Sequence, residues 1–375
     1  MALPKLEAIL EGRNLPGLDG FRMIAVISVV LAHSGVNSFF TARHGVAGFF
    51  VLSGFLITWL LLKEYESSGR ISLRDFYMRR SLRIFPAYYA FILVSIGWDL
   101  FRGNDDINEA ILPGLFYLMN YHNALEGHST SSLAHTWSLA VEEQFYLLWP
   151  IMFLALIKKG REYTIGFLII ISLLVMAWRS YSFTILDFGT SYAYNAFDTR
   201  FDNLAIGCLI AFLIERKSFL RFANTLSSSA WMPLLTISLL YASRQIPSEN
   251  YEYGPAFTID ALLLGVLLLQ FIRLSHGHLW GWLNHSWVVY IGIISYPIYL
   301  WHVWGLQAGN KLNFLPEILQ TTAGILISGM LGALSYHLLE KRFLALKRKY
   351  ERPSKSANTC RQVIPAEVFE KGGGS

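Results

Sequence analysis

Apolar runs about as long as a membrane-spanning helix recur along almost the whole chain of 375 residues. Such a helix needs about 20 apolar residues, because every backbone polar group must be paired internally in lipid. Hydrophobic residues make up 54% of the chain and charged residues only 15%, whereas a soluble domain carries about 25% charge. We therefore predict an all-α, polytopic transmembrane bundle of about ten spans, at about 20–36, 44–62, 84–101, 136–157, 164–184, 201–214, 229–243, 254–272, 286–308 and 316–339.

The stretch 109–120 is too short for a span and is broken by Pro113 and Gly114. We interpret it as an interfacial or re-entrant piece.

The distribution of basic residues predicts the orientation of the bundle. With the N-terminus in the cytoplasm, the inward segments hold 24 Lys and Arg residues and the outward segments hold six. This asymmetry is the one that the positive-inside rule describes. Both termini are thus predicted to be cytoplasmic, with residues 344–375 as a basic tail whose end, Gly372–Ser375, resembles an engineered linker.

The first predicted span contains two ionisable groups, Arg22 and His33. Eleven helical steps return almost to the starting azimuth, so both side chains share one face, about 16 Å apart along the axis. Ionisable groups in a span are costly and usually functional. His33 is our candidate base for taking a proton from a hydroxyl, and Arg22 could bind a phosphate or orient a carbonyl, with Asp19 as its partner. The alternatives are a packing histidine and an arginine that anchors the inner interface.

A second cluster, Arg79, Arg80 and Arg83, precedes the third predicted span on the inner side. Guanidinium groups suit phosphate oxygens, and positions 80 and 83 face the same way on a helix. The cluster could therefore hold a phosphate-bearing donor. Ordinary positive-inside loop charge explains it equally well from the residues alone.

Seven motifs in order resemble those of the family-3 membrane acyltransferases, which O-acylate sugars and some natural products. They are Leu18-Asp-Gly-Phe-Arg22 with His33, Gly48-Phe-Phe-Val-Leu-Ser-Gly-Phe-Leu-Ile57, Phe76-Tyr-Met-Arg-Arg-Ser-Leu-Arg-Ile-Phe-Pro86, His135-Thr-Trp-Ser-Leu-Ala-Val-Glu-Glu-Gln-Phe-Tyr-Leu-Leu-Trp-Pro150, Thr199-Arg-Phe-Asp202, Ser295-Tyr-Pro-Ile-Tyr-Leu-Trp-His302 and Ser335-Tyr-His-Leu-Leu-Glu340. The sequence departs from the family near Ala47, where an acidic residue is common, and at Arg342, where a proline is common.

The resemblance implies that residues 1–343 form an integral-membrane acyltransferase domain in a bacterial inner membrane. It implies acyl-CoA, most simply acetyl-CoA, as cytoplasmic co-substrate on Arg79, Arg80 and Arg83, and a cell-surface carbohydrate or lipid-linked glycan as acceptor on the outer side. We expect membrane lipids as surroundings, and neither a metal nor nucleic acid.

Two further groups of residues are candidates for the site. Glu142 and Glu143 are adjacent in the fourth predicted span, so we expect one of them to line the site, where it could hold the His33 tautomer. The other would pair with an arginine such as Arg200. Residues that could contact the acceptor are His135, Trp137, Arg200, Asp202 and His302, although Arg200 and Asp202 could also pair with each other.

Two other functions stay open at this point. One is acylation of a small natural product such as a macrolide. The other is a proton-coupled transporter, since intramembrane histidine, arginine and glutamate also build relays. The chain shows no two-half symmetry, which speaks against the transporter.

The orientation can be tested with single cysteines and a membrane-impermeant thiol reagent. Cysteines placed at Ser68 and Asn358 should react only after the inner face is opened, whereas one at Asn250 should react in intact cells. A cysteine at Ser68 that reacts from outside would invert the predicted orientation.

Overall fold

The computed structural model describes residues 3–12, 15–36 and 41–350, and within these ranges it contains helices and no strand. Most of the predicted tail, residues 351–375, lies outside the described residues. The longer helices are α2 (Leu18–His33), α3 (Ala42–Ser68), α4 (Leu73–Phe101), α7 (Trp137–Ile157), α8 (Arg161–Thr184), α10 (Phe201–Leu213), α12 (Met232–Arg244), α14 (Ala256–Leu274), α16 (Ser295–Asn310) and α17 (Glu317–Ser335).

Shorter elements connect these helices. They are α1 (Leu6–Leu10), α5 (Asp106–Leu115), α6 (Met119–Glu126), α9 (Gly189–Asn195), α11 (Lys217–Leu226), α13 (Glu249–Glu252), α15 (Ser286–Ile293), α18 (Lys341–Lys347), the 3₁₀ turns Ala134–Thr136, Phe197–Thr199, Gly281–Asn284 and Arg348–Tyr350, and a π-helical turn at Tyr336–Glu340. The stretch 109–120 belongs to the pair α5 and α6, which is too short to span, as the sequence predicts.

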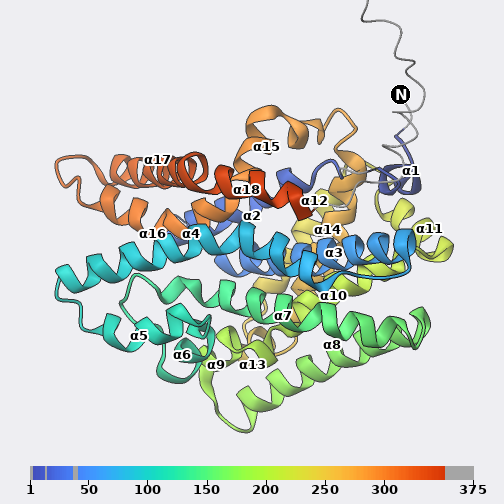
Figure 1. Ribbon diagram of the computed structural model, residues 1–375, viewed down its shortest axis with the longest axis horizontal. Coiled ribbons are helices and arrows are strands. Elements are labelled where there is room, and N and C mark those ends of the chain that lie inside the picture. The colour runs from blue at the N-terminus through green and yellow to red at the C-terminus, as the bar shows by residue number, and fades with distance from the viewer. Residues whose placement is uncertain (1–2, 13–14, 37–40, 351–375) are drawn as a thin grey trace, which may run out of the picture.

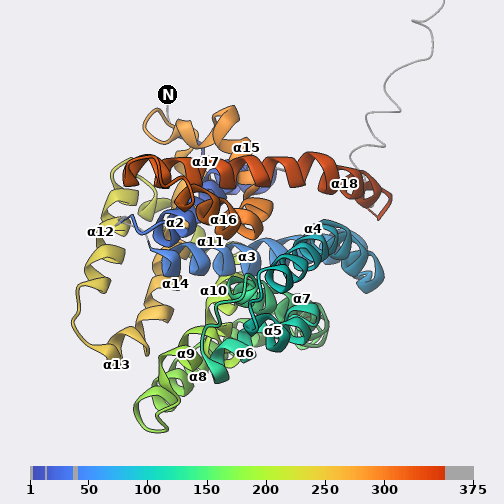
Figure 2. The ribbon, with the colours of Figure 1, turned by 90° about the vertical axis from the view of Figure 1, so that its left-hand side faces the viewer.

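Helices α2, α3 and α10 lie in the middle of the bundle, while α17 and α8 lie at opposite edges (Figures 1 and 2). The central position follows from composition, because apolar residues occur all around α10 and almost all of them are buried. Helix α2 also buries most of its side chains, although it carries Arg22 and His33. A helix that is buried on every side needs no polar face.

All ten predicted apolar runs fold as helices, but fewer of them have the length of a span. Within the described residues, six helices are long and apolar enough to cross a membrane, or seven if the bent pair α15 and α16, with 75° between its axes, is counted as one span. The 16 residues of α2 and the 13 of α10 rise about 24 Å and 20 Å, short of a hydrocarbon core of about 30 Å. The count of ten therefore stays a prediction.

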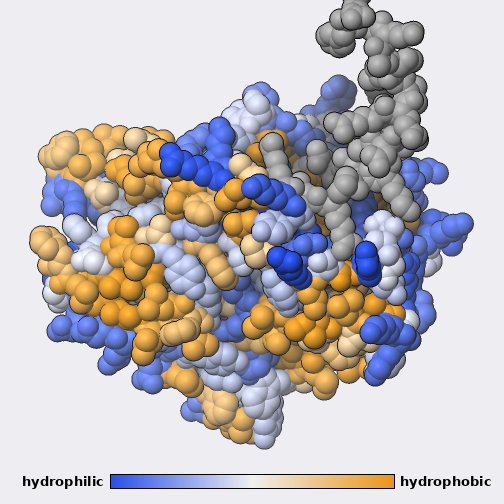
Figure 3. Space-filling view, viewed as in Figure 1, coloured by the Kyte–Doolittle hydropathy of each residue, from blue (hydrophilic) through white to orange (hydrophobic). Residues whose placement is uncertain are grey.

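The outer faces of the long helices expose large aliphatic side chains. Examples are Leu93 on α4, Ile170 on α8 and Met330 on α17, each more than half exposed. Hydrophobic residues also cover broad areas of the face drawn in Figure 3. An apolar surface of this extent on a helical bundle is what lipid contact requires, and the chain is an integral membrane protein.

A very close backbone contact in the centre joins α3 and α10. A Cβ atom on Gly54 would lie 2.0 Å from the carbonyl oxygen of Leu204, and one on Gly207 would lie 2.1 Å from that of Val51. The two glycines therefore let the helix backbones touch, as small residues do in membrane bundles.

We expect Gly207→Ala to push α3 and α10 apart and to cost about 1–3 kcal/mol, the usual penalty of overpacking. The midpoint of thermal unfolding of the purified protein in detergent measures this effect. Gly166→Ala in α8 is the matched control, because open space surrounds that position. Equal midpoints for the two variants would contradict the role of the contact.

Candidate active site

A cavity lined by charged and aromatic side chains lies between α2, α3, α4, α7 and α16. Its volume is about 90 Å³, room for a few water molecules or a group of similar size. These helices are far apart in the sequence, so only the packing of the bundle brings the lining together. The charged lining residues are Arg22, Arg80, Arg83, Glu142 and Glu143.

Both glutamates line this cavity, whereas the sequence predicts that only one does so. Glu142 is held by its neighbours: Oε1 accepts a hydrogen bond from Ser53 Oγ at 2.9 Å, and Oε2 lies 3.3 Å from the hydroxyl of Tyr146. Within the described residues, the buried Oε1 of Glu143 has no hydrogen-bond partner. Neither glutamate forms an ion pair with Arg200, so the predicted pairing is wrong for the part of the chain described. Both carboxylates thus share the cavity with Arg80 and Arg83 of α4.

The arginines of the cavity differ in their surroundings. Arg22 Nη1 donates to Asp19 Oδ1 at 2.5 Å, the partner that the sequence predicts three residues earlier on α2. The Arg80 guanidinium lies over the ring of Tyr146, 4.5 Å from its centroid, an arrangement stabilised by the ring's quadrupole. Arg83 lines the same cavity one helical turn after Arg80.

Arg79 lies apart from this cavity. Its Nη2 binds Glu64 Oε2 at 3.1 Å and its Nη1 donates to the Tyr350 carbonyl oxygen at 2.9 Å. Consecutive residues of a helix point about 100° apart, so Arg79 faces α3 and the C-terminal turn while Arg80 faces inward. The structure thus separates the three predicted donor arginines into two that line the cavity and one that does not.

Three histidines from three helical elements form a second cluster at the far end of α2. The ring centroids of His33 and His302 are 4.9 Å apart, and those of His302 and His135 are 5.1 Å apart. His33 is the exposed member, whereas His135 and His302 are buried.

All three histidines have a backbone carbonyl partner, and a carbonyl oxygen can only accept a hydrogen bond. His135 Nε2 lies 3.1 Å from the Leu300 carbonyl oxygen. His33 Nδ1 donates to the Val29 carbonyl at 2.9 Å, and His302 Nδ1 donates to the Tyr299 carbonyl at 2.6 Å. In both rings Nε2 is therefore the nitrogen with the lone pair in the neutral form. Our suggestion that a glutamate holds the His33 tautomer is wrong, since a backbone carbonyl does so.

Tyr299 connects the cavity with the histidine cluster. Its side chain lines the cavity, its hydroxyl lies 2.5 Å from Ser138 Oγ, and it donates to the His135 carbonyl at 3.0 Å. Its ring centroid is 5.5 Å from that of His302. Tyr299 thus contacts both the charged cavity and the histidine cluster, and we call this row of side chains the polar path.

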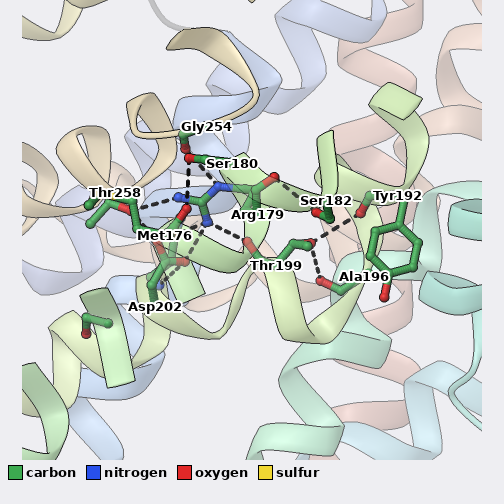
Figure 4. A network of polar contacts seen from close by, with 12 residues as sticks. Met176, Arg179, Ser180, Ser182, Tyr192, Ala196, Thr199, Asp202, Gly254 and Thr258 are labelled. Carbon is green, nitrogen blue, oxygen red and sulfur yellow. Dashed lines mark hydrogen bonds and ion pairs between the residues drawn. The ribbon is translucent and has the colours of Figure 1, made fainter. Parts of the chain in front are cut away.

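The remaining predicted residues, Trp137, Arg200 and Asp202, lie beside this path. Trp137 is buried, with its ring centroid 6.3 Å from that of Phe50 on the cavity wall. Asp202 binds Arg179 rather than Arg200: Arg179 Nη1 lies 3.0 Å from Asp202 Oδ2 (Figure 4). The guanidinium of Arg200 instead lies 6.0 Å from the Trp137 ring centroid.

Sequence reasoning misses several members of the site. Ser53, Tyr146, Tyr296 and Tyr299 lie within the quoted motifs, but none of them is predicted from the sequence to have a role in the site. Helical spacing offers a signal, because Tyr146 is four residues after Glu142, while Tyr299 is three before His302, and such pairs share a helix face.

The fold and these groups define a polytopic helical membrane protein with an ionisable site inside its bundle. Residues 15–336 match the sequence profile of the family described as an acyltransferase domain. The chain therefore belongs to this acyltransferase family, which confirms the resemblance seen in its motifs.

Several curated proteins are similar to this chain. A candidate O-acetyltransferase of Staphylococcus aureus (strain COL) is 32% identical over 313 residues, which cover 77% of this chain and 50% of that protein. The candidate peptidoglycan O-acetyltransferase YrhL of Bacillus subtilis is 30% identical, covering 88% and 55%. The O-acetyltransferase OatA of S. aureus (strain MRSA252) is 26% identical, covering 98% and 65%. The chain thus spans about half the length of the first two. No solved structure matches it significantly.

Proposed function

We propose that this chain is an integral-membrane O-acetyltransferase that moves an acetyl group from cytoplasmic acetyl-CoA to a hydroxyl group of a carbohydrate at the outer face of a bacterial inner membrane. The observation that carries the proposal is the row of side chains that runs from a cavity lined by arginines, through Tyr299, to the histidine cluster. In this cluster, Nε2 of neutral His33 carries the lone pair that can take a proton. The family membership and the names of the relatives support the reaction, and the name of YrhL, a candidate peptidoglycan O-acetyltransferase, supports a carbohydrate acceptor.

Donor binding is assigned to Arg80 and Arg83, with Arg22 opposite them. Coenzyme A carries several phosphates, and guanidinium forks match phosphate oxygens. A cavity of about 90 Å³ admits only a part of such a molecule. Arg79 forms an ion pair with Glu64. It therefore adds positive charge near the cavity but does not line it.

The acceptor side is assigned to the histidine cluster. His33 Nε2 takes the proton of the acceptor hydroxyl while the oxygen of that hydroxyl forms a bond to the thioester carbonyl carbon. The carbon–sulfur bond breaks, and the leaving thiolate takes up a proton, so that the ester and free thiol are the products. His302 and His135 line the approach, Trp137 offers an aromatic face close by, and Arg200 and Asp202 lie behind it. Glu142 and Glu143 balance the arginines of the donor cavity.

The proposal is tested by incubating the purified chain in lipid nanodiscs with acetyl-CoA and a panel of glycans, and by measuring free thiol and O-acetyl ester. Formation of both products supports it. Transfer to macrolides but to no glycan would make the acceptor a small natural product. No thiol release with any acceptor, together with ion-driven uptake in liposomes, would indicate a transporter.

We expect His33→Ala to lower transfer at least 100-fold, because a positioned general base contributes about 10²–10⁴-fold. His33→Gln should fail equally, since an amide keeps polar contacts but cannot take the proton. His278→Ala, an exposed histidine after α14, is the control. Abundance in the membrane should not change in any of the three. Activity near that of the wild type in His33→Gln would remove His33 from the mechanism.

Replacing Arg80 and Arg83 by alanine should weaken acetyl-CoA binding more than tenfold for each hydrogen bond to phosphate that the variant removes, since a charge-assisted hydrogen bond contributes about 1.5–3 kcal/mol. The lysine variants should recover only part of the affinity, because an ammonium keeps the charge without the fork. Titration calorimetry in nanodiscs measures the affinity.

Arg79→Ala is the matched control for this experiment, because it removes an adjacent arginine that faces Glu64. The affinity for dephospho-coenzyme A, which lacks the 3′-phosphate, should differ less between the wild type and the double variant than the affinity for acetyl-CoA does. Equal affinity of the double variant and the wild type would return these arginines to ordinary positive-inside charge.

A further inference from the structure

Arg200 stands between the 3₁₀ turn Phe197–Thr199 and α10, and it is completely buried. Four aromatic rings surround its guanidinium carbon, with centroids 4.2 Å away for Phe257, 5.5 Å for Phe50, 5.5 Å for Tyr194 and 6.0 Å for Trp137. We call this arrangement the Arg200 cage. Aromatic faces attract a cation, but they offer no acceptor for its five N–H groups.

Among the residues that the structure describes, none accepts a hydrogen bond from Arg200 Nε, Nη1 or Nη2. An unpaired charge buried in this way costs several kcal/mol. Buried donors in native proteins are almost always satisfied, by protein, water or a ligand. The guanidinium therefore needs an acceptor that the chain itself does not provide.

The two nearby aspartates are already used by other arginines. Asp202 accepts from Arg179 at 3.0 Å and from the Thr258 hydroxyl at 2.5 Å (Figure 4). Asp260 pairs with Arg43, whose Nη2 lies 3.1 Å from Asp260 Oδ2. Arg43 also pairs with Glu252, at 3.3 Å. Of these three arginines, Arg200 is therefore the one that forms no ion pair within the described residues.

A second unsatisfied side chain follows one helical turn later. Asn203 is fully buried, and in the described part of the chain neither its Oδ1 nor its Nδ2 has a hydrogen-bond partner. The backbone N–H of Asn203 donates to the Arg200 carbonyl at 3.2 Å, which keeps the two residues within one turn of each other, so the Asn203 amide can add a donor beside the fork of Arg200. The cage also shares Phe50 with the wall of the cavity, so the two lie next to each other.

We propose that Arg200 and Asn203 form a binding site for a small oxyanion, a carboxylate or a phosphate group. The planar guanidinium binds two oxygens of such a group side by side, the aromatic walls exclude water, and the bound charge neutralises the third arginine. This site is separate from Arg80 and Arg83, and it exists whether or not the chain transfers acetyl groups. Its natural occupant is either a free anion or a charged substituent of a ligand.

The test uses the purified full chain in detergent, with sodium chloride replaced stepwise by sodium acetate or sodium phosphate at constant ionic strength. A ligand that binds only the folded state raises the midpoint of thermal unfolding with its concentration. We expect a saturable rise with acetate or with phosphate, and the salt that acts identifies the class of anion. The same midpoint in all three salts would overturn the proposal.

Two variants test whether Arg200 and Asn203 are the residues that bind the anion. Arg200→Met keeps the apolar stem and removes the charge, so its midpoint should not respond to acetate or phosphate, and in chloride it should equal or exceed that of the wild type. If this variant does not fold, Asn203→Leu replaces it, with an expected loss of anion affinity of at least fivefold. Arg102→Met is the matched control, because it makes the same substitution at an exposed arginine at the end of α4 and should keep the response to the anion. An unchanged anion response in Arg200→Met or in Asn203→Leu would overturn the proposal.

The same panel separates free anions from charged ligands. Acetate and phosphate report on the site itself, and glycans with and without a carboxylate, measured by the same unfolding assay, report on a substituent. Stabilisation by the carboxylated glycan that disappears in Arg200→Met would identify the substituent as the occupant. Stabilisation by the simple anions alone would identify a free anion. Both readouts are independent of acetyl transfer, so failure of the transfer reaction leaves them intact.

Discussion

The cost of burying charge in an apolar bundle governs the arrangement of this protein. Water cannot solvate an ionised group there, so each ionised side chain must pair with another side chain or bind a ligand. Two ion pairs are examples of pairing between side chains: Asp202 with Arg179, and Asp260 with Arg43. Among the buried groups that lack a full set of partners in the described chain, Glu143 and Arg200 lie in or beside the polar path, where a substrate can supply the missing partner.

The backbone contact between α3 and α10 places this polar path. With α10 packed against Gly54, the neighbouring Ser53 on α3 is oriented toward α7, where it holds Glu142. One helix therefore combines a close structural contact with a site contact on adjacent residues. The same logic applies to α16, which packs along α17 while Tyr299 and His302 face inward.

Much of the candidate site can be predicted from local patterns. The spacing of Arg22 and Asp19 on one helix correctly predicts their ion pair, and the motif order correctly predicts the family. Partners that are distant in the sequence are harder to predict. Asp202 pairs with Arg179 instead of its neighbour Arg200, because a short 3₁₀ turn before α10 directs the two side chains to different surroundings.

The sequence by itself determined the helical class, the position of each apolar run and the family, because hydrophobicity, helical period and short motifs are local properties of the chain. The tertiary structure alone decided that Arg80 lines the cavity while Arg79 does not. It also decided that His33 meets His302, although the two lie near opposite ends of the chain. These outcomes depend on how each helix is rotated and how closely it approaches its neighbours, and contacts between distant side chains set both.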